Sequence, residues 1–564
     1  MAGAVTAGAV HPQSARAGAG RRVAILGGGV AGLTAAHELA ERGFDVTVYE
    51  RRALGGKARS IPVPGSGKDG RPELWGEHGF RFFPGFYRHI PDTMRRIPFA
   101  GNANGVWDNL VPASEVRFSR AGADDTIIPM GKAGRIWSTP DDFRETVGSA
   151  IATSTKMGEA DALYFANRLL VFNTSCDARR FGQWDKVPWK DYVGAGHRSD
   201  EFRMLLSRTL TTLLVAAKDN LASTLTIGTM GEQFLGNPLE SNNDGPLDRL
   251  LNGATNEAWI DPWTNRLRDL GVHFVSAEVR GLDLDGSRIS GARVVDSSGA
   301  AQTVDADYFI SALPVEVART LWTPEILSLR PDLAGMSQLT VDWMTGIQYF
   351  LRRPTDIARG HAAYVDSPWS LTSISQGQYW NRTPITGLGD GTVQDCLSVD
   401  ISDWNTPGIL YGKTAKDCTH DEIAREVWAQ LKAHLNDRAD LLRDEDLHSW
   451  FLDTGIGWDG TRNTNADPLL INTAGSWGLR PESFGPALEN LFLAGDYVRT
   501  NVDLATMEGA SEAARTAVNK LLDVINSDAP RCKLFTLYRA EVLEPFRQLD
   551  IQRFAAGQSN MFDT

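Results

Sequence analysis

A glycine cluster that directly follows a short apolar run constrains the fold of this chain more than any other feature. Residues 23–26 read Val-Ala-Ile-Leu, which is typical of a parallel strand buried on both faces. The next six residues match the pattern G-x-G-x-x-G, and residues 30–42 have a helical composition that ends at Gly43. A second strand is predicted over residues 45–50. This order predicts a βαβ unit and an α/β fold.

Each glycine of this cluster has a separate steric task. Gly27 permits a tight turn, Gly29 lets the backbone approach a pyrophosphate, and Gly32 allows the helix to pack closely on the strand. The free N–H groups at the helix start favour an anion. Glu50 ends the second strand, where its carboxylate can accept hydrogen bonds from ribose hydroxyls. The pattern predicts a dinucleotide site; the alternative is a glycine-rich turn beside a surface glutamate.

Three segments resemble motifs of the flavin amine oxidase and phytoene desaturase superfamily. Residues 51–59 (RRALGGKAR) resemble its second glycine-pair motif, and residues 77–87 (EHGFRFFPGFY) resemble the following segment of plant-type phytoene and carotene desaturases. Residues 490–517 resemble its C-terminal flavin motif. The resemblance implies FAD, which we expect to be non-covalent because no cysteine lies in the three motifs. NAD(P)H is a further candidate, as the electron donor.

The resemblance also implies which residues contact FAD. Gly495 would let a strand end approach the cofactor, Asp496 would accept a ribityl hydroxyl, and the backbone of Val279 would contact adenine. The predicted cofactor-binding residues are Gly27, Gly29, Val30, Ala31, Gly32, Glu50, Arg51, Gly56, Lys57, Ala58, Arg59, Gly79, Phe80, Arg81, Phe82, Val279, Gly495, Asp496, Thr506 and Met507.

Arg81 and His78 are the candidate catalytic residues, although in this family the flavin itself carries the redox step. By the resemblance, residues 79–82 run beside the isoalloxazine ring. The Arg81 guanidinium could stabilise the reduced flavin or anchor a polar group of the substrate; the alternative is a structural ion pair with Glu77 or Glu50. His78 could shuttle protons near neutral pH, or be a buried side chain without a catalytic role.

Later segments predict how the fold is divided. Apolar, β-rich runs near residues 271–311 and 491–494 supply further strands, whereas residues 140–240 look helical and residues 335–405 strand-like. The resulting fold class is α/β (α+β overall), a Rossmann-like FAD-binding domain with a discontinuous inserted substrate domain of helices and a mixed sheet. The expected divisions are a disordered leader (1–20), the FAD-binding domain (21–110, 245–320 and 485–525), the substrate-binding domain (111–244 and 321–484) and a C-terminal helical tail (526–564).

Composition excludes several other functions. Lys and Arg number 57 against 70 Asp and Glu, and a net charge of −13 repels nucleic acid. The four cysteines form no CxxC pair and the ten histidines no HExxH, so we expect no metal site, and a cytoplasmic location. The sequence contains no run of about 18 apolar residues, so no transmembrane segment is predicted. Peripheral contact with a membrane stays open. The oligomeric state is not predicted.

The resemblance implies an FAD-dependent oxidoreductase that transfers hydride between flavin N5 and an extended, apolar, polyene-like small molecule. Aromatic residues in the inserted segments suit such a hydrophobic substrate. The reaction would be desaturation of an isoprenoid or carotenoid, or redox cyclisation of a polyene polyketide such as a tetramate macrolactam, because the phytoene dehydrogenase-like enzymes of those pathways share this motif set. A flavin amine oxidase and a non-catalytic flavin-fold binding protein are the alternatives.

Overall fold

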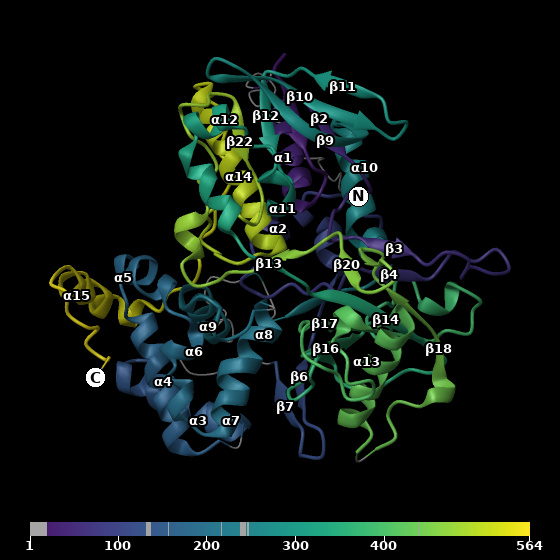
Figure 1. The fold of residues 1–564 in the computed structure, drawn as a ribbon, viewed down its shortest axis with the longest axis vertical. Coiled ribbons are helices and arrows are strands. Elements are labelled where there is room, and N and C mark those ends of the chain that lie inside the picture. Colours follow the sequence, from purple (N-terminus) through teal and green to yellow (C-terminus); the bar gives the residue numbers. More distant parts are fainter. Residues whose placement is uncertain are drawn as a thin grey trace, which may run out of the picture.

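The computed structural model describes residues 18, 20–130, 137–155, 157–215, 217–236, 244, 248–437 and 439–563. Apart from Gly18 and Gly20, the predicted leader lies outside the described residues. Figure 1 shows a sheet with its covering helices at the top, and a helical region and a second sheet side by side below it. Within the described residues, no helix is both long enough and apolar enough to cross a membrane.

The upper part is a seven-stranded sheet assembled from distant stretches of chain. Its parallel core places the first strand between the second strand and a strand from the middle of the sequence. The strand order is β11 (Ala301–Val304), β10 (Arg288–Asp296), β9 (His273–Asp285), β2 (Asp45–Glu50), β1 (Arg22–Leu26), β12 (Tyr308–Ser311) and β22 (Leu491–Leu493).

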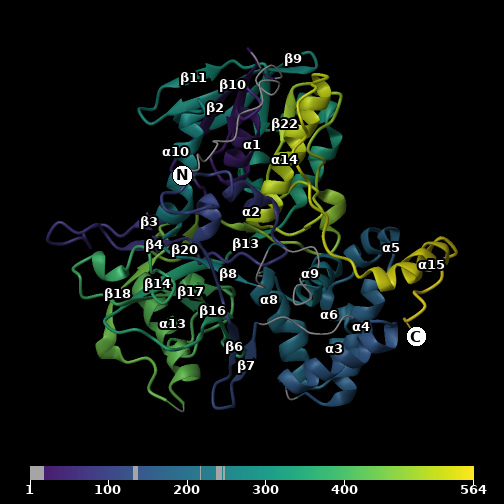
Figure 2. The same cartoon turned by 180° about the vertical axis from the view of Figure 1, so that it is seen from behind.

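Both faces of this sheet are covered, as the continuous apolar sequence of β1 requires. Val23 and Ile25 point into a core shared with helices α1 (Val30–Ala40) and α14 (Met507–Val524). Ala24 and Leu26 point to the opposite core, which contains α11 (Val315–Ala318) and α12 (Pro324–Leu329). Purple α1 and yellow α14 lie side by side in both views although they are far apart in sequence (Figures 1 and 2).

The second sheet is mixed and also has seven strands. One face packs its apolar residues Leu397, Val399 and Ile401 against helix α13 (His420–Leu435). Because side chains alternate along a strand, Ser398 and Asp400 point to the opposite face. The order is β18 (Leu447–Leu452), β14 (Thr345–Leu351), β17 (Asp395–Ile401), β16 (Leu371–Ser375), β15 (Gly360–Tyr364), β6 (Glu115–Ser119) and β7 (Thr126–Pro129).

Most remaining elements are helices at the side of the second sheet (Figure 2). They are α3 (Pro140–Thr155), α4 (Glu159–Asn173), α5 (Asp177–Gly182), α6 (Trp189–Tyr192), α7 (Asp200–Phe202), α8 (Leu210–Val215), α9 (Thr224–Gly236) and α15 (Glu544–Ala555), with α2 (His89–Met94) and α10 (Asp261–Asp269) near the first sheet. Short ladders join β3 (Ser60–Pro62) to β4 (Trp75–Glu77), β5 (Leu110–Pro112) to β8 (Arg249–Leu251), β13 (Val341–Asp342) to β21 (Leu469–Leu470), and β19 (Ile456–Trp458) to β20 (Asn463–Asn465). The predicted fold class is confirmed; the domain boundaries stay predictions.

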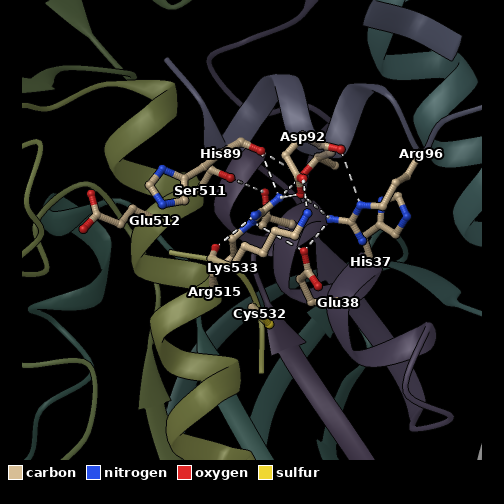
Figure 3. Close-up of polar contacts among 12 residues, drawn as sticks. His37, Glu38, His89, Asp92, Arg96, Ser511, Glu512, Arg515, Cys532 and Lys533 are labelled. Carbon is tan, nitrogen blue, oxygen red and sulfur yellow. Dashed lines mark hydrogen bonds and ion pairs between the residues drawn. The ribbon is translucent and has the colours of Figure 1, made fainter. Parts of the chain in front are cut away.

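A buried cluster of charges joins α1, α2 and α14 (Figure 3). Arg515 is fully buried and contacts Glu38 at 3.4 Å and Asp92 at 2.8 Å. Burial opposes ionisation of Glu38, but Arg96, Arg515 and Arg42 outweigh it and lower the pKa of this carboxyl. The cluster therefore attaches α14 to α1 and α2 by paired charges.

Candidate active site

A cavity of about 330 Å³ lies where the carboxyl ends of the first sheet meet the second sheet. Its wall includes Gly27 after β1, Glu50 at the end of β2, Ala312 after β12 and Gly495 after β22. The second sheet contributes Asp400. Ligands of open α/β sheets bind at this edge, outside the carboxyl ends of the strands.

Two glycine loops form the floor of this cavity and touch each other. Gly27 has φ +108°, and a Cβ on it would lie 2.7 Å from the carbonyl oxygen of Ala312. Gly56 has φ +59°, and a Cβ on it would lie 2.9 Å from the Cα of Gly29. The loops therefore need glycine at these positions to come this close.

Gly32 is the one residue of the predicted cofactor set that does not line the cavity. A Cβ on Gly32 would lie 2.0 Å from the carbonyl oxygen of Gly27, so its role is to let α1 pack against the turn. The cavity wall brings together the rest of the set: Gly27, Gly29, Val30, Ala31, Glu50, Arg51, Gly56, Lys57, Ala58, Arg59, Gly79, Phe80, Arg81, Phe82, Val279, Gly495, Asp496, Thr506 and Met507.

Glu50 is held by the backbone on both of its carboxylate oxygens. One oxygen accepts the N–H of Gly28 at 2.8 Å, and the other accepts the N–H of Arg52 at 2.9 Å. Two backbone donors orient the carboxylate at the end of β2, where it lines the cavity. Lone pairs left on these oxygens can still accept hydrogen bonds from a ligand.

Thr506 and Glu508 lie at the start of α14, and their side chains bind different parts of the backbone. The hydroxyl of Thr506 caps the helix by accepting the N–H of Gly509 at 3.1 Å. The Glu508 carboxylate is 1% exposed and accepts the backbone N–H groups of His89 at 2.7 Å and Ile90 at 3.1 Å. The Glu508 carboxylate therefore binds the start of α2.

Arg81 projects from the segment after β4 and is held by backbone carbonyl groups. Its guanidinium donates to the carbonyl oxygens of Lys57 and Gly79, and to that of Phe80 at 3.2 Å. The expected ion-pair partners are engaged elsewhere: Glu50 as described, and Glu77 by the hydroxyls of Ser60 and Thr255. The structural ion pair considered for Arg81 therefore does not describe this geometry. Burial lowers the pKa of Arg81, against the opposing charges of Glu77, Asp400 and Asp453.

His78 lines the cavity beside Arg81 and forms a pair with Asp453, which follows β18. Asp453 is 2% exposed and also accepts the N–H of Gly455 at 3.1 Å. Burial opposes ionisation of Asp453, but the hydrogen bond and charge of His78 outweigh it and lower the pKa. The Nε2 atom of His78 is buried without a hydrogen-bond partner among the described residues. Asp453 thus fixes the ring by its Nδ1 atom, and no group of the described residues bonds to Nε2.

Asp400 is the acidic wall residue of β17 that motif analysis missed. A Cβ on Gly79 would lie 2.8 Å from its Oδ1 atom, so the carboxyl rests on the segment that carries Arg81. Burial is the main cause that raises its pKa to about 7. An aspartate inside the otherwise apolar and small run 397–401 was the one signal available in the sequence.

Comparison with known proteins decides the family. The family model described as flavin containing amine oxidoreductase matches residues 30–522, most of the chain. The chain belongs to this family. As members of the flavin-containing amine oxidoreductases use FAD, the chain is an FAD-dependent oxidoreductase, and the predicted family is confirmed.

Curated relatives within this family include carotenoid enzymes. A 15-cis-phytoene desaturase of Synechococcus elongatus is 23% identical over 87% of this chain and 93% of its own length. A zeta-carotene desaturase of Synechocystis is 22% identical over 89% of this chain and 97% of its own length. A carotenoid phi-ring synthase of Chlorobaculum tepidum is 23% identical over 50% of this chain. The match covers only 40% of the length of that relative.

Solved structures show the same fold at low identity. A putrescine oxidase has a TM-score of 0.57 with 14% identity, covering 89% of this chain and 99% of its own. A cyclohexylamine oxidase from Brevibacterium oxydans has a TM-score of 0.55 with 14% identity, covering 90% and 99% of the two chains. These likenesses establish the amine oxidase fold.

The residues of the cavity fit the FAD of this family. Bare glycine backbone at Gly29 and Gly56 leaves space that a side chain would occupy, and the start of α1 presents backbone N–H groups there. A carboxylate at each of two strand ends, Glu50 and Asp496, offers acceptors for sugar hydroxyls. This donor and acceptor set matches a dinucleotide.

Proposed function

We propose that this flavin-containing oxidoreductase acts on an extended, apolar, polyene-like molecule. The observation that carries the proposal is the side of the cavity that faces the second sheet, where Phe80, Phe82 and Met344 supply an apolar wall. Two relatives that match nearly the whole chain are carotene desaturases by name, which supports a polyene. Desaturation of an isoprenoid and redox cyclisation of a polyene polyketide both remain within this proposal.

In the proposed reaction, bound FAD supplies hydride chemistry. Gly27, Gly29 and the start of α1 would hold its pyrophosphate, with Glu50 on the ribose. Asp496 would accept a ribityl hydroxyl from its place after β22. These assignments follow from the position of each residue in the cavity wall.

His78 and Arg81 would act on the substrate side of the cofactor. His78, oriented by Asp453, would exchange a proton at Nε2. Arg81, whose guanidinium is held by three backbone carbonyls, would place a fixed positive charge where negative charge develops. Apolar neighbours such as Phe82 would exclude water from this region.

Amine oxidation is the second candidate, because the family model and the two solved structures carry that description. The deciding experiment is anaerobic mixing of the FAD-loaded protein with separate probes: ζ-carotene and its hydroxylated analogues in detergent, putrescine, and cyclohexylamine. Loss of oxidised-flavin absorbance with a polyene supports the proposal. Loss with an amine and with no polyene would overturn it in favour of amine oxidation.

NAD(P)H as electron donor belongs to the same proposal. The test is anaerobic mixing of the oxidised protein with NADH or NADPH, followed by reoxidation of photoreduced protein with oxygen, a quinone and NADP⁺ in parallel. Rapid reduction by either nucleotide supports the role. Reduction no faster than that of free FAD contradicts it.

A further inference from the structure

The carboxyl group of Asp400 lies at the cavity wall, and one of its two oxygens has no hydrogen-bond partner among the described residues. The residue is 7% exposed and lines the cavity from β17. It accepts a backbone hydrogen bond from Phe80, while its Oδ1 atom is buried without a hydrogen-bond partner among the described residues. A buried carboxyl oxygen without a partner is costly, so proteins rarely keep one without a use.

The charged groups around Asp400 have their recorded contacts with other partners, and none of them bonds to its Oδ1 atom. Arg81 donates to backbone carbonyls, as described above. His361 on β15 lies 2.7 Å from Asp248 and packs edge-on against Phe80 and Phe82, with ring centroids 5.4 and 4.8 Å away. Glu77, the third charged neighbour, repels the carboxylate. None of these groups bonds to Oδ1, and the remaining neighbour of the carboxyl group is the cavity that Asp400 lines.

We propose that Asp400 recognises an oxygen-bearing group, a hydroxyl or a carbonyl, on the polyene substrate. The inference rests on the proposed function and narrows the substrate class from any polyene to an oxygenated one. A plain hydrocarbon would fill the cavity and leave the carboxyl without a partner. A site built to bind a polar group discriminates strongly against the analogue that lacks it.

The protonation of Asp400 suits either oxygen group. Burial, with a smaller contribution from Glu77, raises the pKa, whereas Arg81, the Phe80 N–H and His361 lower it, and the balance is about 7. Near neutral pH both forms of the carboxyl are therefore present. The ionised form accepts a hydrogen bond from a hydroxyl, and the protonated form donates one to a carbonyl.

The test compares two ligands that differ in one group. All-trans-retinol and axerophtene, its hydrocarbon analogue with a methyl in place of the hydroxymethyl group, are titrated into the FAD-loaded protein in detergent. Changes in the flavin absorption spectrum give the two dissociation constants. We expect retinol to bind about tenfold more tightly than axerophtene.

Variants then assign the difference to one carboxyl. Asp400→Leu should bring the retinol affinity down to that of axerophtene, with FAD content and axerophtene affinity unchanged. Asp395→Asn is the matched control: Asp395 is a buried carboxylate of the same strand that is bonded to Thr355 and Ser375, away from the cavity. It should lower the melting temperature and keep the tenfold preference for retinol.

Each other result has a definite meaning. Equal affinity of the wild-type protein for both ligands would overturn the inference and leave the proposed polyene function standing. Loss of FAD from Asp400→Leu would also overturn it, by making Asp400 a cofactor contact. No binding of either polyene by FAD-loaded protein would contradict the polyene function itself, and the inference with it.

Discussion

At the residue scale, the chemistry of the cavity wall depends on three side chains that are held in different ways. Asp453 orients His78, backbone carbonyls hold Arg81, and Asp400 keeps one oxygen without a partner. The cost of burying these groups is therefore offset by their partners to different degrees. The shifts that result in the pKa values of Asp400 and Arg81 can be tested through stability and through the flavin potential.

Asp400→Asn should change how stability depends on pH. The pKa of Asp400 is about 7 in the folded protein against an ordinary 3.8, so the folded state binds a proton that the unfolded state has lost between these values. Wild-type stability therefore falls as pH rises from about 4 to about 7, by at most about 4 kcal/mol, and the variant lacks this fall. Melting temperatures of both FAD-loaded proteins at about pH 5 and about pH 8 test it. A constant difference between the proteins would contradict the assignment.

Arg81→Met should lower the midpoint potential of the bound flavin, on the order of tens of millivolts, because it removes a fixed positive charge from the cavity wall. Arg81→Lys should give an intermediate value, since an ammonium cannot reproduce the three carbonyl contacts. Spectroelectrochemical titration measures the potential, and the melting temperature serves as control. A fall in melting temperature with no change in potential would show that Arg81 is only structural.

At the element scale, the turn after β1 and the loop after β2 work as one cradle. The approach of Gly56 to Gly29 fixes the width between them. Glycine is needed at position 56, because a Cβ there would lie 2.9 Å from the Cα of Gly29. Substitutions in this cradle should therefore affect cofactor binding more than comparable substitutions elsewhere.

Gly56→Ala should reduce FAD affinity more than tenfold. Its Cβ would press on the Cα of Gly29, and its φ of +59° adds backbone strain of about 1 kcal/mol. Gly65→Ala is the control, because Gly65 also has a positive φ, +74°, but has nothing within 4 Å of an added Cβ. Equilibrium dialysis against FAD measures both. Equal loss of affinity in the two variants would mean that strain, and not contact between the loops, is responsible.

The sequence predicted the elements whose positions depend on residues close together in the chain. The strand at Asp45–Glu50 and the start of α1 at Val30 lie where the glycine pattern placed them, because strand, turn and helix are adjacent in sequence. Asp400 and Asp453 were missed for the opposite reason. Their positions depend on the antiparallel register of β14, β17 and β18 and on how that sheet meets the first one. No motif in 395–453 carries this information.

At the scale of the whole molecule, paired buried charges hold together segments from opposite ends of the chain. Arg515 on α14 contacts Glu38 on α1 and Asp92 on α2, and donates to the backbone of Lys533 at 3.0 Å (Figure 3). Removing one member of such a cluster leaves the others buried with fewer opposite charges around them.

Arg515→Leu should destabilise the protein by about 3–5 kcal/mol. The double variant Glu38→Leu with Arg515→Leu should recover part of that loss, because the carboxylate that has lost one of its three cations is removed as well. Urea unfolding followed by tryptophan fluorescence measures the four proteins of the cycle. Additive losses in the double variant would show that the two charges are not coupled.

The wall of the cavity is completed by segments that are made long after its first strand. β1 ends at Leu26, whereas β22 and the start of α14 lie beyond residue 490. At about 5–20 residues per second, a ribosome needs on the order of a minute to add the residues between them. Once β12 has been made, the edge that β22 will cover stays open on the nascent chain until Leu491–Leu493 has been added. The complete cofactor site therefore cannot form until β22 and the start of α14 have been made, however early the glycine turn after β1 leaves the ribosome.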